Sequence, residues 1–138
     1  FLDSAGLSAL SAELLPLGVI LTPNLLEAAS LTGHELAALQ RERSARLAAA
    51  HELLERGCRA LVLKGGHAHD QPAADLVLER GHEPVWLTHP RLPGARLHGS
   101  GCRYASALAS ALALGHPLSA AAAQASAWLA ELLQARPA

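Results

Sequence analysis

The chain has 138 residues, enough for one domain with a core of its own, since domains usually run from about 50 to 250 residues. Apolar residues make up 51% and charged residues 17% of the sequence, which favours a compact protein over a disordered one. A net charge of -1 and an aromatic content of 3% argue against nucleic acid as a partner. No apolar stretch reaches the roughly 20 residues that span a bilayer, so we expect no membrane partner.

The cysteines and the first residue bear on where the protein functions and on its extent. Cys58 and Cys102 fall in different predicted elements and form neither a CxxC pair nor a disulfide framework, which favours the cytoplasm. The chain begins with Phe1 instead of Met, and residues 1–3 resemble the end of a buried strand. We therefore expect the natural N-terminus to lie upstream.

The first third of the chain predicts a helix, a strand and a second helix. Leucines at three- and four-residue intervals predict a helix over residues 4–15, closed by Pro16. The apolar run over residues 18–22 predicts a buried parallel strand. Asn24 then starts a helix that ends at Gly33, a residue suited to a left-handed C-cap.

The middle third continues this alternation. Residues 34–43 are polar and expected to be partly helical, and Ser44 is expected to cap a strong helix that stops at Gly57. Residues 59–64 repeat the buried-strand pattern, so this strand and the one before it should be parallel neighbours in a βαβ unit.

The last part predicts a hairpin and two helices. Residues 75–79 and 84–88 read as strands joined by a turn, residues 89–98 as a loop, and residues 101–114 and 118–134 as helices. Trp86 and Trp128 are the large side chains expected in the core. The fold class is α/β.

Residues 98–102, His-Gly-Ser-Gly-Cys, form the strongest candidate site. The glycines around Ser100 allow successive N–H groups to point at one spot, and the following helix adds its positive N-terminal end, an arrangement that favours a phosphate. The alternative is an ordinary glycine-containing helix start. Cys102 lies in the first turn, where thiolate is favoured, and is a candidate nucleophile or base. Its alternative is a buried small hydrophobe, the only role we assign to Cys58.

Two further segments end at the carboxyl edge of the predicted sheet, where α/β proteins collect ligands. Asn24 and Glu27 are explained as a helix cap, and are also candidates to hold Mg²⁺ through water. Lys64, Gly65 and Gly66 are candidates to neutralise nucleotide phosphates, with a solvated turn as the alternative. The nearby residues His67, His69 and Asp70 lack a second ligand cluster, and we treat them as loop.

The order of these segments carries a family resemblance. TPNLLEA, a strand running into KGGH, Asp75-Leu76, and HGSGC before an Ala/Ser-rich helix together resemble the hydroxymethylpyrimidine/phosphomethylpyrimidine kinases of thiamine biosynthesis. The resemblance covers essentially all 138 residues. It implies a ribokinase-like fold, a mostly parallel sheet flanked by helices with a C-terminal hairpin. It also implies transfer of the ATP γ-phosphoryl group to hydroxymethylpyrimidine and then to its monophosphate.

The resemblance also implies roles for individual residues. Cys102 would be the base for the substrate hydroxyl, and the amides of Gly99, Ser100 and Gly101 would form the anion hole. Asn24, Lys64, Gly65 and Gly66 would bind ATP phosphates, and Glu27 would hold Mg²⁺ through water. Ser100 stands where the family commonly has threonine, which keeps the hydroxyl. Arg103-Tyr104 replaces smaller residues, and Arg103 could assist or obstruct phosphate binding.

Length is the larger departure from the family. Family members are about twice as long, as a doubly wound nucleotide-binding sheet requires, so residues 1–138 resemble the ATP-side, C-terminal portion as one domain, without the N-terminal half. We expect a homodimer or completion by that missing half. Pyridoxal kinase is an alternative enzyme, and a non-catalytic nucleotide-binding or assembly module is an alternative of another class.

Overall fold

The computed structural model describes residues 3–91 and 99–134, which belong to two compact units, Phe1–Thr88 and His89–Ala138. The strand end expected at Phe1 and Leu2 lies outside the described residues, as do loop residues 92–98, which include His98. Among the described helices, none is both long and apolar enough to cross a membrane.

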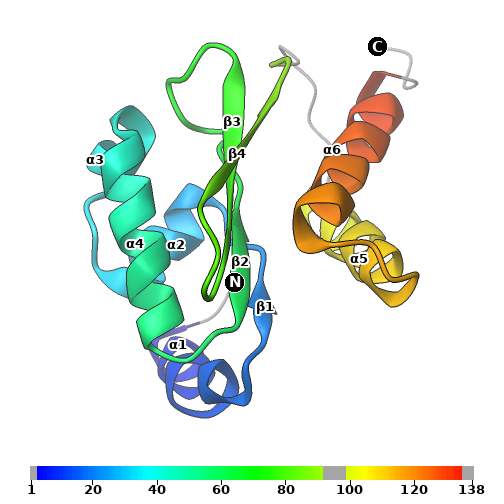
Figure 1. The fold of residues 1–138 in the computed structure, drawn as a ribbon. Helices are drawn as coiled ribbons and strands as arrows, with labels where there is room; N and C mark the ends of the chain where they lie inside the picture. The colour runs from blue at the N-terminus through cyan, green and yellow to red at the C-terminus, as the bar shows by residue number, and fades with distance from the viewer. Residues whose placement is uncertain (1–2, 92–98, 135–138) are drawn as a thin grey trace. The chain divides into compact units, whose positions relative to one another are not determined.

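A four-stranded sheet organises the first unit (Figure 1). Its strands are β1 (Ile20–Leu21), β2 (Ala60–Leu63), β3 (Ala73–Glu79) and β4 (Val85–His89), in that order across the sheet. β1 and β2 are parallel, with Leu21 opposite Leu61, which confirms the predicted βαβ pairing. β2 and β3 are antiparallel, with Leu63 opposite Leu76, so the described part of the sheet is mixed. The predicted hairpin is confirmed as β3 and β4.

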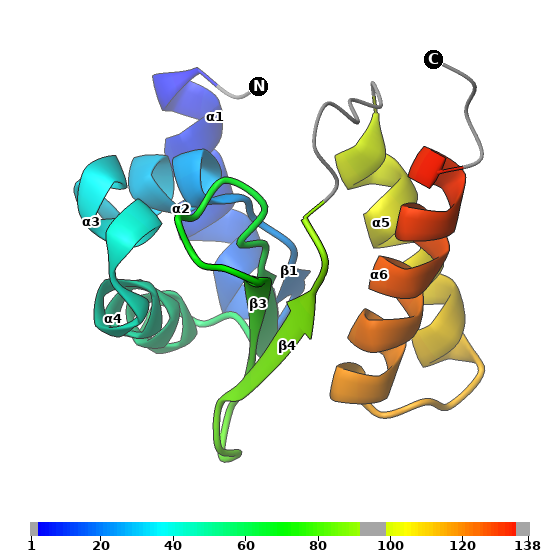
Figure 2. The same ribbon diagram turned by 90° about the horizontal axis from the view of Figure 1, so that it is seen from above.

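Three helices cover one face of this sheet: α2 (Leu25–Thr32), α3 (Leu36–Arg41) and α4 (Arg43–Glu55) (Figures 1 and 2). Alternate residues of β2 and β3 pack with them because side chains alternate between the two faces of a strand. The resulting core is built from leucine, alanine and Cys58, and its strand residues are Leu61, Leu63, Leu76 and Leu78.

The first predicted helix is less regular than its leucine spacing indicates. Helix α1 covers Ser4–Ala9, capped by Asp3, whose Oδ1 accepts the N–H of Gly6 at 2.8 Å. A π-helical turn (Leu10–Leu14) and a 3₁₀ turn (Leu15–Leu17) follow it. The 3₁₀ turn contains Pro16, and the chain leaves it through Gly18 at a φ of 71°.

The expected cap of α4 at Ser44 is wrong. The N-cap is Glu42, two residues earlier, with extended backbone and no side-chain capping bond, and α4 begins at Arg43. Glu42 is also the residue on which α3 ends, since its N–H donates to the carbonyl of Ala38. One extended residue therefore separates the two helices, which leaves no room for a separate cap at Ser44.

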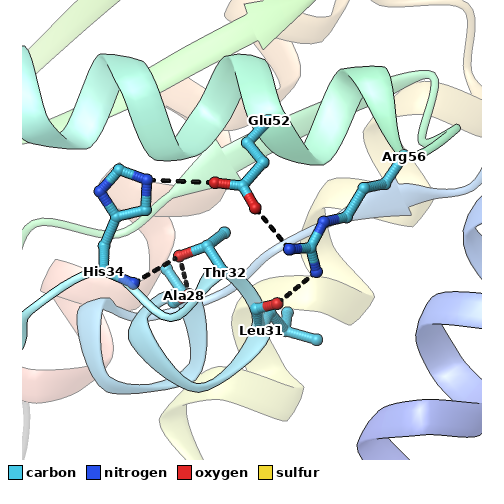
Figure 3. Close-up of polar contacts among 6 residues, drawn as sticks. All are labelled: Ala28, Leu31, Thr32, His34, Glu52 and Arg56. Atoms are coloured by element: carbon cyan, nitrogen blue, oxygen red, sulfur yellow. Dashed lines mark hydrogen bonds and ion pairs between the residues drawn. The ribbon is translucent and has the colours of Figure 1, made fainter.

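A polar network ties the end of α2 to α4 (Figure 3). The Thr32 hydroxyl donates to the Ala28 carbonyl at 2.8 Å and accepts the N–H of His34 at 3.3 Å. His34 Nε2 lies 3.1 Å from Glu52 on α4, and Glu52 also contacts Arg56. Arg56 also donates to the Leu31 carbonyl, so the network holds the C-terminal end of α2 against α4.

The second unit pairs α5 (Ser100–Ala113) with α6 (Leu118–Gln134), which confirms both predicted helices. Tyr104 is 2% exposed, and its hydroxyl donates to the Ala122 carbonyl at 3.4 Å. The expectation that Trp128 lies in the core is wrong, because 42% of this residue is exposed on α6. Trp86, in the first unit, is partly buried against the core.

Candidate functional site

The carboxyl ends of β1 and β2 bring two predicted site residues side by side. Beyond the two strands, their parallel pairing continues as a bridge between Asn24 and Lys64. The N–H of Lys64 donates to the carbonyl of Pro23 at 2.9 Å. Two segments 40 residues apart therefore meet at the edge of the sheet where α/β proteins bind ligands.

Asn24 and Glu27 form a complete capping box at the start of α2. Asn24 Oδ1 accepts the N–H of Glu27 at 2.9 Å, and Glu27 Oε2 accepts the N–H of Asn24 at 2.8 Å. The structural explanation for this pair is confirmed. The cap uses one oxygen of each side chain, so the second carboxylate oxygen of exposed Glu27 lies outside the capping box, and an exposed carboxylate is suited to a hydrated cation.

A groove of about 430 Å³ borders the same helix start. Its walls are mainly apolar, contributed by leucines of α1, the π-helical turn, β1 and α2. Thr22, Glu27 and Ser30 are its polar lining residues. Glu27 therefore lies where a mostly apolar hollow meets the carboxyl edge of the sheet.

The Lys64-Gly65-Gly66 segment leaves β2 under tight constraint at Gly65. The N–H of Gly65 donates to Asp75 Oδ1 at 2.7 Å, and an added Cβ at Gly65 would lie 1.8 Å from the Ala74 carbonyl oxygen. Gly66 is exposed, and an added Cβ there would meet nothing within 4 Å. The two glycines that the sequence presents as equivalent therefore have different structural requirements.

Asp75 is the polar residue at this edge that sequence reasoning did not assign to the site. It is 4% exposed, inside a strand whose neighbours are Ala74 and Leu76. A carboxylate is rarely buried unless it is hydrogen-bonded or paired. An aspartate inside an otherwise apolar strand was the signal in the sequence that could have found it.

The rest of the β2–β3 connection is anchored to α4 by Asp70. Its carboxylate accepts from Arg46 Nη2 at 2.6 Å and from Arg43 Nε at 3.0 Å. Both guanidinium groups lie over Trp86, at 4.9 Å for Arg43 and 5.3 Å for Arg46, within cation–π range. The hydrogen bond from fully buried Arg46 holds the pKa of the Asp70 carboxyl below its usual range. Asp70 therefore anchors the far part of the β2–β3 connection to α4.

The glycine-rich segment opens α5 in the second unit. Gly99 is the N-cap at a φ of 76°, a left-handed conformation that favours glycine. The N–H groups of Ser100, Gly101 and Cys102 belong to the first helical turn, which has no acceptors within the helix. Cys102 is exposed, so the alternative of a buried hydrophobe is wrong for it. This geometry is suited to an anion.

The two neighbours of Cys102 that depart from the family pattern differ in environment. Tyr104 is buried between α5 and α6, where it serves packing, and Arg103 is exposed. Cys58 is fully buried in the first unit, and burial raises its pKa to about 11. Its assignment as a small core residue is confirmed.

The predicted site residues divide between the two units. Asn24, Glu27 and residues 64–66 lie in Phe1–Thr88, and residues 99–102 lie in His89–Ala138. The structure brings together the members of the first group. The convergence of both groups on one nucleotide stays a prediction.

Comparison with known proteins finds one matching family model and relatives that carry the same name. The model of the family described as phosphomethylpyrimidine kinase matches residues 1–138. The hydroxymethylpyrimidine/phosphomethylpyrimidine kinase of Rhizobium meliloti is 39% identical over 122 residues, and that of Streptomyces coelicolor is 42% identical over 114. These matches cover 88% and 83% of this chain but 44% and 40% of the relatives. The chain thus spans less than half the length of these relatives.

A solved structure supports the same fold. The pyridoxal kinase from Staphylococcus aureus in complex with AMP-PCP and pyridoxal matches with a TM-score of 0.83 at 29% identity. The match covers 94% of this chain and 47% of that one. The ribokinase-like α/β fold expected from the sequence is confirmed.

Proposed function

Because the chain belongs to the phosphomethylpyrimidine kinase family, we propose that it is the ATP-side portion of a kinase for hydroxymethylpyrimidine and its monophosphate. The observation that carries this proposal is that one chain of this family contains two segments whose geometry is suited to binding phosphate. One is the Asn24–Lys64 edge of the sheet, and the other is the glycine-rich start of α5. The match to the family model covers residues 1–138, which include both regions.

In the proposed transfer to hydroxymethylpyrimidine, the substrate hydroxyl oxygen attacks the γ-phosphorus of ATP, and the bond from that phosphorus to the β–γ bridging oxygen breaks. Cys102 takes the hydroxyl proton, and ADP leaves. The amides of the 99–101 segment and of the first turn of α5 stabilise charge on the moving phosphoryl group. Positioning and charge neutralisation supply most of the rate in such transfers.

The first unit would hold the rest of the nucleotide. Lys64 and the Gly66 amide are proposed to contact the phosphates, and Asn24 to contribute its side-chain amide. Glu27 fits an Mg²⁺ site through water, because it is an exposed carboxylate with one oxygen outside the capping box. When bound, Mg²⁺ would neutralise charge on the phosphate oxygens. Gly65 would act through its backbone conformation, since its N–H is donated to Asp75.

The acceptor site is proposed to require the part of the relatives' length that this chain does not span, supplied by the same polypeptide or by a second chain. Free Cys58 and Cys102 are compatible with a reducing compartment, and we propose the cytoplasm. A homodimer stays a prediction.

The test is a phosphoryl-transfer assay on the full-length gene product. Hydroxymethylpyrimidine, its monophosphate and pyridoxal are supplied as separate acceptors. We expect phosphorylation of both pyrimidines. Pyridoxal kinase is the second candidate, favoured by the match to the Staphylococcus aureus enzyme. Phosphorylation of pyridoxal alone would establish that alternative, and ATP binding without turnover of any acceptor would indicate a non-catalytic nucleotide-binding module.

Cys102→Ser tests the proposed base. Turnover should fall by about two to four orders of magnitude, the usual scale for general-base catalysis, while ATP affinity stays nearly unchanged. Cys58→Ala is the matched control, since Cys58 is buried in the core and should affect stability but not turnover. Full turnover in Cys102→Ser would remove Cys102 from the mechanism.

A further inference from the structure

The backbone changes partners where it leaves β2. The last β2–β3 pair is Leu63 opposite Leu76, and the next two backbone donors then point to different neighbours. The N–H of Lys64 donates to the Pro23 carbonyl at 2.9 Å, toward β1. The N–H of Gly65 donates to the Asp75 carboxylate at 2.7 Å, toward β3. A side-chain oxygen therefore holds the chain at the point where the backbone ladder ends.

Packing restricts this point as well. An added Cβ at Gly65 would lie 1.8 Å from the Ala74 carbonyl oxygen, so the two backbones are in direct contact. The Ala68 N–H donates back to the Gly65 carbonyl at 2.9 Å, which closes the turn that contains Gly66. Gly65 is thus constrained through its donor, its acceptor and its α-carbon, while Lys64 and Gly66 on either side are less buried.

The charge of Asp75 needs an explanation, because a carboxylate near a phosphate site would repel the ligand. Asp75 is 4% exposed, and a buried carboxylate is tolerated when hydrogen bonds satisfy it. Its bond to the Gly65 N–H directs one carboxylate oxygen at the backbone of the loop. That arrangement is suited to setting the loop's conformation.

We infer that Asp75 is a positioning residue for the Lys64-Gly65-Gly66 loop. Its carboxylate holds the Gly65 backbone and thereby sets how Lys64 and the Gly66 amide are presented to the phosphates of a nucleotide. The inference rests on the proposed function of this loop. It assigns Asp75 no contact with ATP.

Four variants test the inference. Asp75→Ala removes the acceptor, Asp75→Asn keeps a carbonyl oxygen for the Gly65 N–H, and Lys64→Ala tests the loop's role directly. Asp70→Asn is the matched control, because Asp70 lies in the same β2–β3 connection but bonds Arg43 and Arg46 on α4. ATP affinity is measured by calorimetry, and amide hydrogen exchange of Gly65 and Gly66 by NMR. Asp75→Leu, close in shape, replaces Asp75→Ala if that variant does not fold.

In Asp75→Ala we expect ATP binding about tenfold weaker, a common loss for residues that support a ligand-binding group, and faster exchange at Gly65. Asp75→Asn should retain most of the ATP affinity. The ATP affinity of Asp70→Asn should stay within about twofold of the wild-type value, since a misplaced ligand contact would cost much more than that. If ATP affinity were unchanged in Asp75→Ala but reduced in Lys64→Ala, the inference about Asp75 would be overturned while the proposed function of the loop would stand. Unchanged Gly65 exchange would also overturn the inference. Unchanged affinity in Lys64→Ala would instead overturn the proposed function of the loop.

Discussion

Replacing Gly65 with alanine should destabilise the first unit far more than the same change at Gly66. The new methyl group would lie 1.8 Å from the Ala74 carbonyl oxygen and 2.8 Å from its carbonyl carbon, and both are backbone atoms that cannot rotate away. Relief requires β3 and the loop to separate, which stretches the bond from the Gly65 N–H to Asp75. The substitution therefore combines overpacking with the loss of a buried hydrogen bond to a charged group.

The magnitude follows from these two effects. Overpacking costs about 1–3 kcal/mol, and a hydrogen bond to a charged group contributes about 1.5–3 kcal/mol. Together they predict a loss of about 2.5–6 kcal/mol, a large share of the roughly 5–15 kcal/mol that stabilises a typical domain. With a urea m-value of about 2 kcal/mol per molar, the unfolding midpoint should fall by about 2 M.

The assay is urea unfolding followed by circular dichroism and by the fluorescence of Trp86, which lies in the first unit, in a Trp128→Phe background that removes the other tryptophan. Gly66→Ala is the control, because an added Cβ there meets nothing within 4 Å. It should change stability by less than about 1 kcal/mol, and a small gain is expected from the stiffer unfolded chain. If the free energies of unfolding of Gly65→Ala and Gly66→Ala agreed within about 1 kcal/mol, the typical effect of a single substitution, the close approach to Ala74 would be refuted.

Two further predictions concern Asp70 and the cysteines. The lowered pKa of Asp70 means that its ion pair stabilises the folded state above the ordinary carboxyl pKa, and this contribution is lost as the pH falls below it. The stability difference between wild type and Asp70→Asn, measured by urea unfolding, should therefore narrow as the pH falls from 7 to about 3, a range set by the ordinary carboxyl pKa. A constant difference would refute the pairing. Iodoacetamide at neutral pH should modify exposed Cys102 but not Cys58, whose pKa is raised to about 11, until the chain is unfolded. Peptide mass spectrometry checks this, and native labelling of Cys58 would contradict it.

The elements that could be predicted are those whose signals are local. Asn24, Glu27 and Gly33 mark both ends of α2, because a capping box and a left-handed C-cap are formed by residues within one turn of each end. The buried strands could be predicted from their apolar runs, and their parallel pairing from the helices between them. The start of α5 at the glycine-rich segment was predicted for the same reason.

The errors arose where packing between elements decides the outcome. Ser44 has good capping chemistry, yet Glu42 takes the extended conformation because α3 ends directly at it. Trp128 has the composition of a core residue, but it lies on an exposed position of α6. The leucine spacing of residues 4–15 did not reveal that the helix changes to a π-helical and then a 3₁₀ turn.

The sequence by itself determined the order of strand ends and helix starts, and with it the family, because caps, glycines and apolar runs act over a few residues. Only the tertiary structure decided what holds the candidate phosphate loop. Asp75 bonds Gly65 across 10 positions, and Arg46 bonds Asp70 across 24. Such partners meet only when β3 and α4 have packed against the loop, and no local pattern specifies that. The same packing separates Gly65, which must be glycine, from Gly66, where a side chain fits.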